Sequence, residues 1–284
     1  MTQGIVVGLD GTDQANAAAR WAAAEAVLRG TGVRLVHVKE MSPDALLPFA
    51  TREPDEPWAE DLLARTATGL RERHPDLSVT TRLLPSDPVA SLVAAAEEGD
   101  LLVLGSRALG GMAGYLIGSV GMTVAGRVNR PVVLVRSVGT SPSQGPVVVG
   151  VDLRQPVDTV LGFAFEEAAR RLARVQVVYT QQLSAYGALG PSMVPDIRPT
   201  VAPEIQRSLD ELLEPWQEKF PDLSAAGRVA IGSAGQELVH AAGGAALVVV
   251  GRRARGSALG TRIGNVAHAV LHHCHSPVAL VPHD

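Results

Sequence analysis

The chain contains an internal repeat, and this repeat limits its fold more than any other feature of the sequence. The stretch Leu101–Val135 returns as Leu247–Val281, with an offset of 146 residues. Near the start of each copy, Val149–Asp152 repeats Val7–Asp10 with an offset of 142 residues. Two constant offsets of this kind indicate a tandem repeat of one structural unit rather than a solenoid of many.

The difference between the two offsets predicts one small insertion. We place it in the segment 181–200, which is rich in Gly, Pro and Ser. The segment 140–146, Thr-Ser-Pro-Ser-Gln-Gly-Pro, has the composition of a flexible linker between the copies. The sequence therefore predicts two domains, residues 1–139 and 146–284.

Each copy alternates apolar runs with Ala-rich segments of helical length. Aromatic residues make up only 4% of the chain, so the core must consist mainly of Val, Leu, Ile and Ala, as in buried parallel strands. Strict alternation of this kind predicts an α/β fold: two tandem doubly wound domains, each with a five-stranded parallel sheet in three α/β/α layers. The strands expected in the first copy are Ile5–Val7, Val33–Val38, Val79–Leu84, Leu101–Leu104 and Val132–Val135.

Three expected strands of the first copy end in residues that suit a ligand. Parallel sheets bind ligands outside the carboxyl ends of their strands, near the point where the strand order reverses. There, Asp10 can accept a hydrogen bond from an adenine amino group or a ribose hydroxyl, and Val38 can form an apolar wall. Gly105 opens a glycine-rich loop that leads to Gly118-Ser119 at an expected helix start. Unpaired backbone N–H groups at a helix start suit a phosphate.

The same glycines have a simpler interpretation, which the sequence leaves open. They can serve only to turn the chain tightly and to pack a helix against a strand. A glycine loop alone favours this simpler interpretation, whereas three converging strand ends favour a nucleotide. Arg107 would add a positive charge beside the loop.

The segments VVGLDGT, LVHV, LLVLGSR, GSV and RPVVLV together resemble the universal stress protein family, over nearly the whole chain and in both copies. The resemblance implies an ATP-binding domain of the adenine nucleotide alpha hydrolase-like fold that pairs through its last strand. The chain would then be an intramolecular pseudo-dimer, with a homodimer left open, and would act as a stress-response sensor or regulator. The contacts implied in the first copy are Gly8, Leu9, Asp10, Val38, Leu104, Gly105, Arg107, Gly118, Ser119 and Val120.

Both copies depart from the family pattern, the second more than the first. Ala108 and Ala254 stand where the family has its second signature glycine, and a Cβ there would crowd a ligand or forbid a positive φ. The second copy carries an unusually basic loop, with Arg252, Arg253, Arg255 and Arg262, which is either an anion or nucleotide site of altered specificity or a solvated loop. Its implied contacts are Asp152, Gly251, Arg253, Gly264, Asn265 and Val266.

A histidine-rich tail raises the question of zinc. His268 and His272 share a helix face if this segment is helical, and His273, Cys274 and His275 follow. The alternative is a set of cations at a helix C-terminus, where the helix dipole favours them. The first copy has Arg127 at the position of His273, so we favour the alternative and expect no metal site.

Charge and missing motifs exclude several function classes. A net charge of −4 argues against a general binder of nucleic acids or anionic membranes. One cysteine, no membrane-length apolar run and no signal-peptide pattern favour a cytoplasmic protein. We find no GxxxxGK[ST], no GxGxxG after the first strand and no GxSxG around Ser119, so we expect no catalytic residues.

The expected ligand is therefore ATP or another adenine nucleotide, with or without Mg²⁺. Two alternatives stay open at this stage. One is an interaction module that dimerises and docks partners without a nucleotide, and the other is a slow ATPase without a dedicated base.

Overall fold

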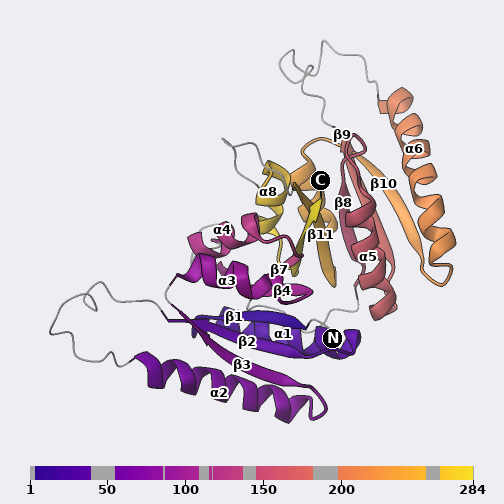
Figure 1. Cartoon of the computed structure of the whole chain (residues 1–284). Coiled ribbons are helices and arrows are strands. Elements are labelled where there is room, and N and C mark those ends of the chain that lie inside the picture. Colours follow the sequence, from indigo (N-terminus) through magenta and orange to yellow (C-terminus); the bar gives the residue numbers. More distant parts are fainter. Residues whose placement is uncertain are drawn as a thin grey trace. The chain divides into compact units, whose positions relative to one another are not determined.

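The computed structural model describes residues 4–39, 55–85, 87–108, 115–116, 118–136, 145–181, 198–253 and 263–283. The chain divides into two compact units, Met1–Pro142 and Ser143–Asp284 (Figure 1). Among the described helices, none combines the length and the apolar character that a membrane span requires.

The first unit alternates strands and helices, as the sequence predicts. Its elements are β1 (Ile5–Leu9), α1 (Asp13–Arg29), β2 (Val33–Val38), α2 (Asp55–Arg73), β3 (Val79–Leu84), α3 (Pro88–Glu97), β4 (Leu101–Gly105), β5 (Arg107–Ala108), β6 (Tyr115–Leu116), α4 (Ser119–Arg127) and β7 (Val132–Val135).

The second unit follows the same plan without the short β5–β6 pair among its described residues. Its elements are β8 (Val147–Val151), α5 (Asp158–Arg171), β9 (Val175–Gln181), α6 (Arg198–Lys219), β10 (Ala225–Ile231), α7 (Ala234–Ala241), β11 (Leu247–Arg253), α8 (Asn265–His273) and β12 (Val278–His283).

The main sheet of each unit has five strands, all of them parallel, and the β5–β6 pair is not part of it. The order is β3-β2-β1-β4-β7 in the first unit and β10-β9-β8-β11-β12 in the second. In both units the strand order reverses beside the first strand, between β1 and β4 or between β8 and β11. This reversal leaves a crevice outside the carboxyl ends of the two strands, which is where such folds bind ligands.

Helices cover both faces of the first sheet. Helices α1 and α2 contact each other on one face, and α3 and α4 contact each other on the opposite face. In the second unit, α7 packs against α8, and Phe165 of α5 stacks on Trp216 of α6 at 5.5 Å between ring centroids. The inner strands β1, β4, β8 and β11 are mostly buried Val, Leu and Ile, in agreement with the low aromatic content, whereas the edge strands β3 and β10 are partly exposed.

Local signals explain where the helices begin and end. Thr12 is the N-cap of α1 and accepts a hydrogen bond from Ala15 N, and Gly30 ends the helix in the left-handed conformation. Asp87 caps α3, and Pro88 occupies its first turn.

One expectation about the glycine-rich loop needs correction. The sequence predicts an irregular loop from Gly105 to Gly118, but two short strands form within it. Arg107 pairs with Leu116 and Ala108 with Tyr115 in an antiparallel ribbon. The two arms of the loop therefore satisfy part of their backbone hydrogen bonding with each other. Residues 109–114 and 117, including three of the loop glycines, lie outside the described residues.

Candidate functional site

The end of β1 forms a tight, hydrogen-bonded turn in the first unit. Asp10 follows the strand directly, and its Oδ1 accepts hydrogen bonds from the backbone N of Thr12 at 3.0 Å and from its Oγ1 at 2.5 Å. Gly11 has a φ of +80°, and a Cβ there would lie 2.9 Å from the ring of Trp58. The turn therefore holds the exposed carboxylate of Asp10 at the carboxyl edge of the sheet.

The end of β2 lies beside this turn and is less open than the sequence suggests. His37 Nδ1 lies 2.8 Å from the carbonyl oxygen of Leu9, and the His37 ring meets Trp58 edge-on at 5.5 Å between centroids. Val38 is only 8% exposed. It therefore offers a ligand a small apolar contact rather than a broad wall.

Gly105 and Gly118 of the first unit have different structural roles. A Cβ on Gly105 would lie 2.6 Å from Ala15 N and from the carbonyl carbon of Gln14, so this glycine allows α1 to pack on β4. This supports the packing interpretation at Gly105. A Cβ on Gly118 would meet nothing within 4 Å, because this residue faces open space at the start of α4.

The start of α4 has the features of an anion site. Gly118 is the N-cap and forms no side-chain cap, so the N–H groups of the first turn, at Ser119 and Val120, have no intrahelical partner. Ser119 is exposed beside them. Among the described residues with a side chain on Cα, only Leu172 has a positive φ, so Ala108 needs none. The side chain of Arg107 lies outside the described part of the chain.

The second unit holds a cleft of about 770 Å³ at the matching edge of its sheet. We call it the second cleft. It opens at the ends of β8, β9 and β11 and at the start of α8, where Gly264 again forms no side-chain cap. Its lining includes all six residues predicted for this copy: Asp152, Gly251, Arg253, Gly264, Asn265 and Val266.

Arg154, which is not among the predicted site residues, forms a bidentate ion pair with Asp152. Arg154 Nε lies 2.9 Å from Oδ1 of Asp152, and its Nη2 lies 3.1 Å from Oδ2. The backbone N of Arg154 also donates to Oδ1 at 3.1 Å. These hydrogen bonds from Arg154 hold the pKa of Asp152 below its ordinary value.

The end of β9 also differs from its counterpart in the first unit. Tyr179 stands where the first unit has His37, and its hydroxyl donates to Oε1 of Gln181 at 2.8 Å. Burial raises the pKa of Tyr179, which lies close enough to Arg154 and Asp152 to sense both charges. Arg154 and Tyr179 both line the second cleft. The offset of 142 residues, which relates them to Thr12 and His37, could have located them.

The predicted basic loop of the second copy needs correction. Arg252 and Arg253 do not lie in a loop, because β11 continues past Gly251 and pairs them with Pro282 and His283 of β12. Arg252 is 1% exposed, whereas Arg253 is exposed and lines the cleft. Arg255 and Arg262 lie outside the described residues. Of these four arginines, the structure therefore brings Arg253 to the site.

The histidine-rich helix α8 brings two rings together. His268 and His272 lie 4.2 Å apart between ring centroids, and Cys274 is buried beyond them. Across the described ranges, no group of three or more His, Cys, Asp or Glu side chains has an arrangement that could hold a metal ion.

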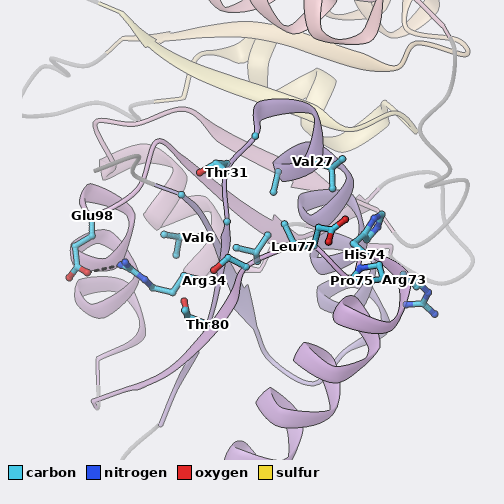
Figure 2. Close-up of a pocket in the computed structure, with 17 residues that line it drawn as sticks. Val6, Val27, Thr31, Arg34, Arg73, His74, Pro75, Leu77, Thr80 and Glu98 are labelled. Atoms are coloured by element: carbon cyan, nitrogen blue, oxygen red, sulfur yellow. Dashed lines mark hydrogen bonds and ion pairs between the residues drawn. The ribbon is translucent and has the colours of Figure 1, made fainter.

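Another cavity, of about 780 Å³ and separate from the second cleft, lies at the amino edge of the first sheet. Figure 2 shows His74, Pro75 and Arg73 at the end of a helix on one side of it, and the Arg34–Glu98 ion pair on the other. The C-terminal ends of α1 and α2 meet here, and such ends disfavour anions. The cavity shares no lining residue with the predicted site.

Comparison with known proteins identifies the family of the chain. The model of the family described as "Universal stress protein family" matches residues 1–136 and again residues 145–282. The chain belongs to the universal stress protein family. Two universal stress proteins of Mycobacterium tuberculosis, Rv2005c and Rv2623, are 33% and 32% identical to it. Each alignment covers 97% of this chain and 95% of the relative.

Solved structures of universal stress proteins share the two-unit fold. One from Archaeoglobus fulgidus covers 98% of both chains with a TM-score of 0.74 at 14% identity. Smaller relatives match about half of this chain. One from Archaeoglobus fulgidus, 27% identical, is in complex with dAMP and covers 46% of this chain and 96% of its own, with a TM-score of 0.37. Another, 26% identical, is in complex with cAMP and covers 48% and 97%, with a TM-score of 0.36.

Proposed function

We propose that this universal stress protein binds an adenine nucleotide, ATP above all, at the carboxyl edge of its sheets and acts as a stress-response sensor or regulator. One observation carries the proposed location of the ligand: the six residues predicted for the second copy line a single cleft of about 770 Å³. That volume falls within the range of about 300–1,000 Å³ that is usual for small-molecule sites.

The internal repeat extends this argument to the first unit. Asp10 corresponds to Asp152, and Gly118-Ser119 corresponds to Gly264-Asn265. Both helices begin without a side-chain cap, so both present unpaired N–H groups to a phosphate. In the first unit, the carboxylate of Asp10 at the same edge can receive a ribose hydroxyl or an adenine amino group.

The choice of an adenine nucleotide comes from family membership, since dAMP and cyclic AMP are the ligands of the two relatives named above. ATP, with or without Mg²⁺, is our proposal for this chain. We further propose that the protein binds ATP without a dedicated general base, as the motifs of the sequence suggest. Incubation with labelled ATP and Mg²⁺ tests this point, and release of phosphate at an enzymatic rate would contradict it.

Calorimetric titration with ATP tests the binding proposal. Gly118→Val should weaken binding at one site by at least about tenfold, because the new side chain stands in the open space before α4. Gly69→Val is the matched control, since a Cβ at Gly69 in α2 also meets nothing, away from the carboxyl edge. Equal affinities for all three proteins, or no binding by the wild type, would refute the proposal.

A further inference from the structure

The two units differ in the residue that stands three positions after the first strand. Thr12 in the first unit corresponds to Arg154 in the second. Thr12 donates to Asp10 and caps α1, whereas Arg154 donates to both carboxylate oxygens of Asp152. Both carboxylate oxygens of Asp152 therefore already accept hydrogen bonds from the chain itself.

The hydroxyl of Tyr179, which lines the same side of the second cleft, also has an internal partner. The hydroxyl of Tyr179 donates to Gln181, and the phenol ring is buried, with 8% of the residue exposed. A ribose or a base would have to compete with these internal hydrogen bonds. The side of the cleft near β8 and β9 is thus poorly suited to read a nucleoside.

The opposite side of the cleft is suited to anions. Exposed Arg253 lines it, and the first turn of α8 adds N–H groups at Asn265, Val266 and Ala267 without intrahelical partners. Arg154 uses Nε and Nη2 on Asp152, and its guanidinium has further N–H donors. The negative charge of Asp152 is balanced by the positive charge of Arg154. Arg253 therefore gives the charged side chains of the lining a net positive charge.

We propose that the second cleft selects its ligand by an oligophosphate chain rather than by adenosine. Arg154 and Arg253 hold the phosphates together with the start of α8, and Asp152 orients the guanidinium of Arg154. The inference rests on the proposed function, because it assigns a ligand class to one of the two proposed sites. It predicts that ATP, GTP and inorganic triphosphate bind there alike, whereas the first unit requires the nucleoside.

Amide NMR of the full chain separates the two sites. Shifts of Asn265 and Val266 report on the second cleft, and shifts of Ser119 and Val120 report on the first unit. The probes are ATP, GTP, inorganic triphosphate and adenosine. At the second cleft we expect the dissociation constants of the first three to agree within about fivefold, and we expect no shift with adenosine.

Arg154→Thr, which installs the residue of the first unit, should weaken inorganic triphosphate at the second cleft by about tenfold. Arg207→Thr on the exposed surface of α6 removes the same charge elsewhere and should leave the affinity unchanged. The inference is overturned if ATP binds the second cleft more than about tenfold tighter than both GTP and triphosphate, or if no probe shifts Asn265. Failure of the proposed function would show separately, as no response of Ser119 to ATP.

Discussion

Leu172 combines two unfavourable features at one position. It ends α5 in the left-handed conformation, with a φ of 50° and a ψ of 38°, and it is 90% exposed. The first unit has Gly30 at the corresponding place, with a φ of 62°. A leucine in this conformation crowds its Cβ against the following carbonyl oxygen, which glycine avoids.

Leu172→Gly is therefore expected to stabilise the second unit by about 1 kcal/mol. Urea unfolding followed by circular dichroism measures the change as a higher midpoint. Ala173→Gly, at the next residue, is the control and should lower the midpoint, because Ala173 does not have a positive φ. A lower midpoint for Leu172→Gly would contradict the prediction.

The Asp152–Arg154 pair makes a prediction about pH. Hydrogen bonds from Arg154 lower the pKa of Asp152 from its ordinary value of 3.8. A lowered folded-state pKa contributes stability above the ordinary value, and this contribution is lost as the pH falls through the lowered pKa. Arg154→Met should raise the pKa of Asp152 in a carboxyl ¹³C titration, and Arg207→Met should not. An unchanged pKa in Arg154→Met would show that the pair does not form in solution.

The sequence predicts where the candidate site residues lie on the elements, but it does not predict their hydrogen-bond partners. Asp10, Gly118 and Asp152 lie at the strand ends and helix starts that the alternation predicts. The bidentate contact of Arg154 with Asp152 depends on a side-chain conformation, which no spacing rule provides. The offset of 142 residues shows only that arginine replaces Thr12 there.

At the scale of elements, Gly105 and its counterpart Gly251 differ in what surrounds them. Gly105 of β4 lies against the first turn of α1, where a Cβ would meet backbone atoms at 2.6 Å. Its counterpart Gly251 of β11 faces the ring of His283, where a Cβ would lie 2.8 Å from the Cδ2 and Nε2 atoms. A side-chain ring moves more easily than the backbone of a packed helix.

Gly105→Ala should therefore lower the free energy of unfolding by about 1–3 kcal/mol, the usual cost of overpacking. Gly251→Ala should cost less, because its Cβ would meet side-chain atoms rather than the backbone of a packed helix. Chemical denaturation of the two variants compares them directly. A larger loss for Gly251→Ala would contradict this ranking, and no loss for Gly105→Ala would show that Gly105 is not required for helix packing.

Strand ends were the least predictable part of each element. The sequence predicts β4 to end before Gly105 and places Arg252 and Arg253 in a loop, but β11 continues to Arg253. Its last residues pair with β12, which also extends to His283. Pairing between two strands decides where both end, and this information is not local to either segment.

At the scale of the whole molecule, the tandem repeat predicts the two units and the strand composition of each sheet. Periodicity and alternation suffice because buried parallel strands read as continuous apolar runs. The cavity at the amino edge of the first sheet was not predicted, since it arises where loops and helix ends meet. Pairing of the two units through their last strands remains a prediction of the family resemblance.

The central claim is that the nucleotide binds at the carboxyl edge of the sheets. A crystal structure of the full chain grown with ATP tests it most directly. We predict nucleotide density in the first unit beside Asp10, with the phosphates at the start of α4 near Gly118 and Ser119. Density instead among Arg34, His74 and Glu98 at the amino edge, or none in either unit, would contradict the account.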